Sequence, residues 1–322
     1  LSDSREELPG TVAVIDTATN AVLTQIPVGR TPLFGSLNTA GSRLYVPNFG
    51  DGTVSVIDTG NNTVVATVTT SGTPTYAVVN PAGTKVYAPG LTTNVVSVID
   101  TATNTVTREI ATEPHPQALA FSTDGSRAYL TARDVNALQV IDTGTDTVIA
   151  TVPVGKRPIR PVVDPKGGRV FVPNFEGDSV SVVSTATNTV TRTITVGNGP
   201  IPPVINAQGT RMWVANGTDG TVSEVNIGPR PGKNPVVRTI KVGANPSFSL
   251  LDANGDSLYI ANQGSATLSG ICTLTGKVTQ TFATGDRPRQ IVGGPALYSV
   301  DQGGGQISVF AAARLGSGAC SK

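Results

Sequence analysis

The sequence predicts an all-β protein, a seven-bladed β-propeller of four-stranded antiparallel blades, from a repeat, a strand pattern and a recurring aromatic residue. The repeat has a period of 42 residues, and one propeller blade needs about 40 to 45 residues. Six matching segments start 42 residues apart, and intervals of 46 and 39 residues lead to two more: TVAVID (11–16), TVSVID (53–58), VVSVID (95–100), ALQVID (137–142), SVSVVS (179–184), TVSEVN (221–226), TLSGIC (267–272) and QISVFA (306–311). The longer interval contains a Pro- and Gly-rich loop (228–235), and an insertion in a loop leaves the strands in register.

Each repeat unit divides into four short strands joined by turns. In one unit the expected strands are PLFGSLN (32–38), RLYVPN (43–48), TVSVID (53–58) and TVVATV (63–68). Val, Ile and Thr favour extended backbone, and the Gly and Asn residues between the strands provide the positive φ of tight turns. Apolar residues stand on both faces of the third strand, which is expected for a sheet packed between two neighbouring sheets.

The second strand of the unit indicates how many blades there are. It occurs seven times, each time with an aromatic residue at its centre: Tyr45, Tyr87, Tyr129, Phe171, Trp213, Tyr259 and Tyr298. The chain opens with a third-type and a fourth-type strand (11–27) and ends with strands of the first three types (288–310). We therefore expect residues 1–322 to form a single domain in which strands from the two ends of the chain close the ring and protect its sheet edges.

Composition and charge exclude several classes of partner. The formal net charge is +1 and no run of Lys or Arg occurs, so we expect no nucleic acid partner. No stretch approaches the ~20 apolar residues of a bilayer span, so no membrane span is expected. The sequence begins at Leu1, which is compatible with removal of a signal peptide, and we expect an exported protein that is extracellular or periplasmic. We further expect a monomer without a cofactor.

The chain has two cysteines, Cys272 at the end of an expected strand and Cys320 near the C-terminus. A disulfide between them would hold the C-terminal tail against the body of the protein. The alternative is two separate thiols, because the sequence does not give the distance between them.

The second-strand motifs resemble those of a known repeat family. YVPN, YAPG, YLTA, FVPN, WVAN and YIAN are each followed by a TVSVIDT-like strand, and the pattern is similar to the YVTN-type β-propeller repeat family over nearly the whole chain. This resemblance implies the propeller fold. It implies less about function, because the family includes surface-layer proteins, exported binding proteins and some enzymes.

Strand direction predicts which loops carry the function. The loop from a fourth strand to the next first strand lies on the same face as the loop from a second to a third strand. Each loop of the first kind ends in a proline, while the residues around the proline differ between units. We expect a ligand to bind at this face, and the candidate ligand-binding residues are Arg157, Arg160, Arg287, Arg289, Phe34, Tyr76, Phe49, Phe175, Asn174 and Phe248.

Guanidinium groups beside aromatic rings suit a small anionic or partly aromatic ligand, or a peptide. In the alternative interpretation, these arginines pair at a solvated rim with acidic residues: Glu113, Asp134, Asp286 or Asp301. The turns on the opposite face are rich in Gly and Asx and are typical of a scaffold. One of them, DANGDS (252–257), is similar to the start of a calcium loop but lacks the distal glutamate, so no metal site is expected.

The candidate catalytic residues are His115, Glu113 and Asp301. His115 is the only histidine, which excludes sites that need two imidazoles and leaves one imidazole as an acid or base. Our first hypothesis is a binding or interaction protein. The first alternative is an enzyme of the lyase, cyclase or isomerase class, in which His115 acts as acid or base and the arginines hold the substrate. The second alternative is a structural cell-surface protein.

Overall fold

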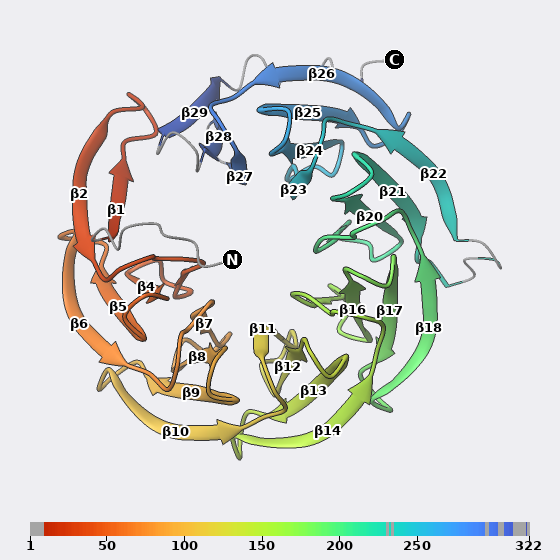
Figure 1. The fold of residues 1–322 in the computed structure, drawn as a ribbon. Helices are drawn as coiled ribbons and strands as arrows, with labels where there is room; N and C mark the ends of the chain where they lie inside the picture. Colours follow the sequence, from red (N-terminus) through yellow and green to blue (C-terminus); the bar gives the residue numbers. More distant parts are fainter. Residues whose placement is uncertain are drawn as a thin grey trace. The chain divides into compact units, whose positions relative to one another are not determined.

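The computed structural model describes residues 10–229, 232, 235–293, 296–301, 306–311 and 320. All regular structure in this part of the chain is β-strand, which confirms the predicted all-β propeller class (Figure 1). The chain divides into two compact units, Leu1–Pro153 and Val154–Lys322, and each is described by itself. Among the described residues there is no helix with the length and apolarity that a bilayer span requires.

The first unit contains a two-stranded sheet and three four-stranded antiparallel sheets. Its strands are β1 (Gly10–Ile15), β2 (Val22–Val28), β3 (Ser36–Leu37), β4 (Arg43–Asn48), β5 (Thr53–Asp58), β6 (Thr63–Thr69), β7 (Val78–Val79), β8 (Lys85–Gly90), β9 (Val95–Asp100), β10 (Thr105–Ala111), β11 (Pro116–Phe121), β12 (Arg127–Ala132), β13 (Ala137–Asp142) and β14 (Thr147–Pro153). In every sheet the strands lie side by side in chain order, as expected for blades joined by hairpins.

The second unit contains three four-stranded antiparallel sheets and a three-stranded sheet. Its strands are β15 (Val162–Val163), β16 (Arg169–Asn174), β17 (Ser179–Ser184), β18 (Thr189–Thr195), β19 (Val204–Ile205), β20 (Arg211–Asn216), β21 (Thr221–Asn226), β22 (Val236–Lys241), β23 (Pro246–Leu251), β24 (Ser257–Asn262), β25 (Thr267–Cys272), β26 (Lys277–Ala283), β27 (Pro288–Gly293), β28 (Ala296–Asp301) and β29 (Gln306–Ala311). Third-type and fourth-type strands thus begin the chain, and strands of the first three types end it. That both ends complete one blade stays a prediction.

The first strand of the blade is shorter than the sequence predicts. We expected residues 32–38 to be extended, but only Ser36–Leu37 form a ladder, and Pro32 makes an isolated bridge with Asn48. Proline has no N–H to donate to a ladder. In β11 and β23 the ladder reaches the proline, but its register shifts between the proline and the residue two positions later.

The core lies between neighbouring sheets, as the two-sided apolar pattern predicts. In the first unit, Tyr45 and Val56 of one blade pack with Val86 and Ile99 of the next. In the second unit, Phe171 packs with Met212 in the same way. Each fully buried side chain of this size contributes about 1.5–3 kcal/mol to the free energy of unfolding, so neighbouring blades stabilise one another.

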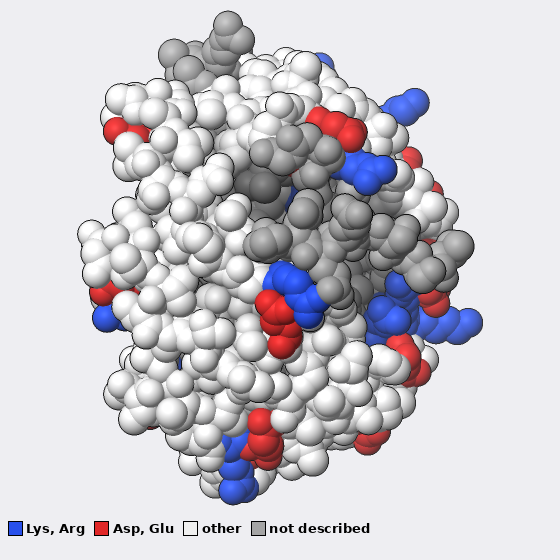
Figure 2. All heavy atoms as spheres, turned by 60° about the vertical axis from the view of Figure 1, so that its left-hand side comes forward, with Lys and Arg blue, Asp and Glu red and all other residues white. Residues whose placement is uncertain are grey.

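Charged side chains are few and scattered on the face drawn in Figure 2, where basic and acidic groups often adjoin. Among the ion pairs of the described residues, Arg30 Nε lies 2.5 Å from Asp51 Oδ1. Ion pairs whose side chains are about one-third exposed contribute about 0–1 kcal/mol each to the free energy of unfolding.

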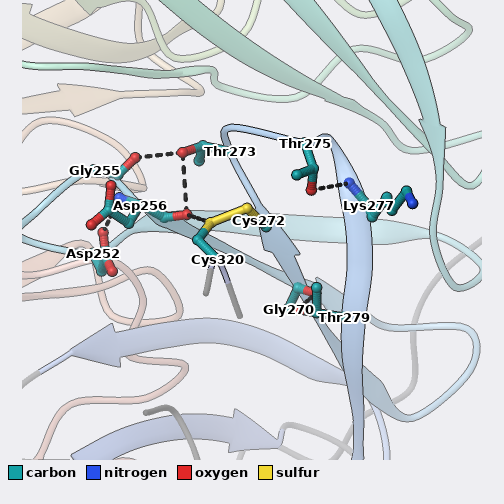
Figure 3. The surroundings of a disulfide bond; sticks show 10 residues. All are labelled: Asp252, Gly255, Asp256, Gly270, Cys272, Thr273, Thr275, Lys277, Thr279 and Cys320. Atoms are coloured by element: carbon teal, nitrogen blue, oxygen red, sulfur yellow. Dashed lines mark hydrogen bonds between the residues drawn. A yellow bond between two sulfur atoms is a disulfide. The ribbon is translucent and has the colours of Figure 1, made fainter. Parts of the chain in front are cut away.

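Cys272 and Cys320 form a disulfide, which decides between the two alternatives that the sequence leaves open (Figure 3). Cys272 ends β25 and is fully buried. The bond therefore fixes Cys320 to the end of β25, an inner strand of the sheet β23–β26. Disulfides of this kind form and persist in oxidising compartments.

Candidate functional site

The structure brings the two predicted kinds of loop together within each blade. A backbone N–H just after the second strand donates to the carbonyl of the residue before the loop proline: Phe49 to Thr31, Leu91 to Thr73, Arg133 to His115, Phe175 to Arg157, Gly217 to Gly199 and Gln263 to Asn245. We call this end of a blade the loop end, and the opposite end, which carries the two hairpin turns, the turn end.

Most residues that precede a loop proline have a left-handed backbone. The φ values are 50° at Thr31, 54° at His115, 52° at Arg157, 67° at Gly199, 48° at Asn245 and 54° at Arg287. Glycine and asparagine adopt this conformation readily, but other residues pay about 1–2 kcal/mol for it. His115, Arg157 and Arg287 therefore stand at positions where glycine would be less strained, and such strain is often found at functional sites.

A recurring asparagine locks the loop end of four blades: Asn48, Asn174, Asn216 and Asn262, each 0% exposed. Its side-chain amide donates to two hydroxyls on the third strand, as Asn174 does to Ser179 and Ser181 at 3.1 and 3.0 Å. A glycine of the preceding loop lies against it, and a Cβ on Gly155 would stand 2.5 Å from the Asn174 Cγ. The asparagine and the glycine thus require each other. Asn174, which the sequence predicts as a ligand-binding residue, therefore stabilises the loop end of its blade.

We expect Gly155→Ala to lower the free energy of unfolding by about 1–3 kcal/mol, because the added methyl overlaps a fully buried amide. The blade β7–β10 has Ser71 and Gly90 at the two matching positions, so Gly155→Ser combined with Asn174→Gly should recover most of the loss. Urea unfolding followed by circular dichroism measures both. The matched control is Gly168→Ala, since a Cβ there has open space. Equal urea midpoints for Gly155→Ala and Gly168→Ala would contradict the steric conflict between a side chain at position 155 and Asn174.

The contact between the asparagine and the glycine also explains the positions of two candidate catalytic carboxylates, Glu113 and Asp301. Glu113 stands at the glycine position, in a blade where Ala132 replaces the asparagine and leaves room for a side chain. Its backbone N–H donates to Gln139 Oε1 at 2.9 Å. Asp301 replaces the asparagine itself and is 1% exposed.

Both carboxylate oxygens of Asp301 already accept hydrogen bonds. Ser299 Oγ donates to Oδ1 at 2.7 Å, and Ser308 Oγ and the Gly285 N–H donate to Oδ2 at 2.5 and 3.0 Å. Asp301 therefore holds the loop before β27 in the second unit. Glu113 and His115 share one loop of the first unit, and the joint role of the three residues stays a prediction.

His115 is part of a charged group at the loop end of the blade β11–β14. Its Nδ1 lies 2.8 Å from Asp134 Oδ2, and Arg133 Nε lies 3.1 Å from Asp134 Oδ1. The His115 side chain is 45% exposed, so it reaches solvent. The carboxylate of Asp134 can orient the ring, and an oriented imidazole that reaches solvent is the arrangement that an acid or base requires.

Arg157 lies between an aromatic ring and a carboxylate at the loop end of the blade β15–β18. Its guanidinium carbon is 5.3 Å from the centre of the Phe175 ring, and its Nη1 is 2.6 Å from Glu176 Oε1. In the alternative interpretation, the arginines pair with acids at a solvated rim. Arg157 forms such a pair, with Glu176 as the acid. Arg160, three residues later, is partly buried, and no ion pair joins it to another described residue.

The other candidate residues take different places. Phe34 and Tyr76 stack with ring centres 4.9 Å apart and an interplanar angle of 14°. Phe248 packs against the core beside β27, and Phe49 is partly buried. Arg287 and Arg289 are exposed on either side of Pro288.

The described part of the second unit also has a cleft that the sequence reasoning missed. Its volume is about 900 Å³, and it lies at the turn end of the blades β19–β22 and β23–β26. Arg211, Trp213, Glu224 and Arg238 line it from the first of these blades. A signal was present in the sequence, because Glu224 stands where six other third strands have valine.

Burial raises the pKa of the Glu224 carboxyl, and Arg238 and then Arg211 oppose this shift. The side chain is 3% exposed, with Oε2 at 2.9 Å from Arg238 Nε and Oε1 at 3.8 Å from Arg211 Nε. A carboxylate at this depth is stable only because cations accompany it.

The turns at this end are held by local hydrogen bonds of their own acidic side chains. The backbone N–H groups of Asn61 and Gly60 hold the pKa of the Asp58 carboxyl below its usual value, with Arg43 adding to the effect. In the turn similar to a calcium loop, Asp252 Oδ1 accepts the Asp256 N–H at 2.8 Å. No cluster of His, Cys, Asp and Glu suited to a metal ion occurs among the described residues.

Comparison with known proteins gives one family and several similar structures. The model of the choice-of-anchor I domain matches residues 1–165. Among curated proteins, none matches the chain.

Three solved structures illustrate the fold likeness. Kuenenia stuttgartiensis hydrazine synthase is 19% identical with a TM-score of 0.71, covering 87% of this chain and 95% of that one. A functionally unknown protein from Desulfotomaculum acetoxidans is 17% identical with a TM-score of 0.68, covering 94% and 96%. A Bacteroides uniformis protein described as a candidate 6-phosphogluconolactonase is 18% identical with a TM-score of 0.67, covering 86% and 93%. At these identities the likeness shows the fold alone.

Proposed function

Because this chain belongs to the choice-of-anchor I domain family, we propose that it is an exported β-propeller protein that binds a small anionic, partly aromatic ligand or a peptide at the loop ends of its blades. The family description, with its choice of anchors, suggests a cell-surface or exported protein. The disulfide between Cys272 and Cys320 supports an oxidising, extracellular or periplasmic location.

The observation that carries the binding proposal is the pair of arginines around Pro158. Arg157 keeps a strained left-handed backbone and stacks on Phe175, and Glu176 is the acid that it contacts. Arg160 is partly buried without an ion pair to a described residue. A planar guanidinium beside an aromatic ring suits a ligand that joins a carboxylate or phosphate to an apolar ring.

We expect Arg157→Gly to weaken the binding of aromatic anions by about 5- to 30-fold while leaving stability unchanged or higher. Glycine is chosen because it removes the guanidinium and relieves the left-handed strain at the same time. Isothermal titration calorimetry with benzoate and phenyl phosphate measures the affinity, with benzyl alcohol as the uncharged comparison.

The matched control is Arg43→Ala, which removes an arginine that pairs with Asp58 at a turn end. This variant should bind the anions like the native protein. Native protein that binds neither anion, or an affinity that survives both Arg157→Gly and Arg160→Ala, would contradict the proposal.

A second candidate function rests on the contact between His115 and Asp134 at 2.8 Å. A histidine oriented by a carboxylate suits an enzyme of the lyase, cyclase or isomerase class that moves a proton on the bound anion. The test is incubation in D2O with small carboxylic acids that carry a C–H bond next to a carbonyl group, because a base that removes this proton exchanges it with the solvent. Nuclear magnetic resonance should then show deuterium in the acid with the native protein and none with His115→Ala.

A further inference from the structure

The cleft at the turn end of the second unit has a polar floor that the blade fold does not require. Trp213 and Glu224 are 3% and 2% exposed, and both line the cleft. Trp213 and Glu224 are paired across β20 and β21. The equivalent pair in the blade β3–β6 is Tyr45 with Val56, so an apolar residue at the position of Glu224 is compatible with the fold. A buried carboxylate in this place costs stability and therefore calls for another explanation.

Several polar atoms of this floor lack hydrogen-bond partners among the described residues. They are Trp213 Nε1, Arg211 Nη1 and Glu224 Oε2. Glu224 Oε2 does contact Arg238 Nε at 2.9 Å, as an ion pair. Native proteins rarely leave buried donors and acceptors unpaired, so such a group points to a bound molecule or to water that fills the cleft.

The side walls of the cleft offer the same mixture of groups. Asp252, Asp256, Thr273 and Cys320 also line the cleft, and Figure 3 shows these residues together near the disulfide. Arg211, Arg238 and Glu224 come from the blade β19–β22 and the two aspartates from the blade β23–β26, so the cleft contains two arginines and three acids, and neither sign of charge dominates. The volume of about 900 Å³ lies within the range of about 300–1,000 Å³ that is typical of small-molecule sites.

From this floor and these walls, we propose that the cleft binds a neutral polyhydroxylated ligand, a saccharide. A hydroxyl group both donates and accepts, so one ring can accept from Trp213 Nε1 and Arg211 while donating to Glu224. An anion would be attracted by the arginines but repelled by three carboxylates. The cleft lies at the opposite end of the blades from the proposed anion site and is independent of it.

The side chain of Arg238 lies beside the Glu224 carboxylate on the floor. It is 34% exposed, and its Cδ and Nη1 lie 2.4 Å from where a Cβ on Gly276 would stand. Arg238 therefore crosses from β22 to the turn before β26, over the carboxylate that it pairs with. Displacement of this long and partly solvated side chain opens a path for a hydroxyl group to Glu224.

The single tryptophan of the chain makes the test direct, because all indole fluorescence comes from Trp213. The native protein is titrated with cellobiose, maltotriose and chitotriose, and separately with citrate. We expect at least one saccharide to change the emission saturably and citrate to leave it unchanged. Glu224→Gln should raise the Kd for that saccharide by about tenfold or more, because the amide keeps the shape but loses the charged acceptor.

Circular dichroism confirms that Glu224→Gln is folded, and Glu109→Gln, at an exposed position of β10, is the matched control that should bind like the native protein. An emission that no saccharide changes, a change that persists with equal Kd in Glu224→Gln, or saturation by citrate alone would overturn the proposal.

Discussion

Cys320→Ser should unfold at a markedly lower urea concentration than the native protein. The disulfide joins residues 48 positions apart, and closing a loop of that length in the unfolded chain is worth about 4 kcal/mol in the chain-entropy description. Cys272 is fully buried and remains as a small apolar thiol, so the variant leaves the core of the sheet β23–β26 intact. The loss therefore measures the cross-link itself.

Urea unfolding followed by circular dichroism should give equal midpoints for Cys320→Ser in the presence and absence of a reductant. The native protein should fall to the same midpoint when it is reduced. Cys272→Ala is a poor substitute, because it also removes a buried side chain. A native midpoint that reduction does not move would contradict a stabilising bond.

Arg238→Ala should cost about 2–3 kcal/mol at neutral pH, whereas Glu224→Val should be close to neutral. Removing Arg238 leaves a nearly buried carboxylate with Arg211 alone, at 3.8 Å, and an uncompensated buried charge is strongly destabilising. The cost stays below that of a fully buried pair because Arg238 is itself one-third exposed. Valine occurs at the matching position of six other third strands, so Glu224→Val restores their packing.

The penalty of Arg238→Ala should shrink as the pH falls. The folded-state pKa of Glu224 lies above its unfolded value, since burial disfavours the charged form. The stability that follows from this shift is fully present below the unfolded pKa of about 4.3 and is lost as the pH rises through the folded pKa. Removing Arg238 raises the folded pKa further, so the loss grows between acidic and neutral pH.

Urea midpoints of the native protein, Arg238→Ala and Glu224→Val at several pH values above pH 4 measure these effects. The stability difference between the native protein and Arg238→Ala should widen as the pH rises. A difference that is constant with pH would show that Arg238 acts through packing and not through the charge of Glu224.

The candidate site illustrates the limit of prediction from the sequence. Prolines and positive-φ positions are local features, so the loop ends and their arginines and aromatic residues could be located. The partners of these residues could not be predicted, because the sequence offers several acids for each. In the structure, Glu176 pairs with Arg157 and Asp134 contacts His115. Which acid lies within reach depends on the exact course of two loops, and spacing along the chain does not give it.

By itself, the sequence determined the second, third and fourth strands of the repeat unit and their order, because hydrophobic alternation and turn chemistry act over a few residues and a period of 42 repeats them. Only the tertiary structure decided which distant side chains meet. It pairs Cys272 with Cys320, sets Gly155 against Asn174, and gathers Trp213, Glu224 and Arg238 at one cleft. These contacts depend on distances between strands and blades, which are fixed by packing and are not encoded in any short stretch of residues.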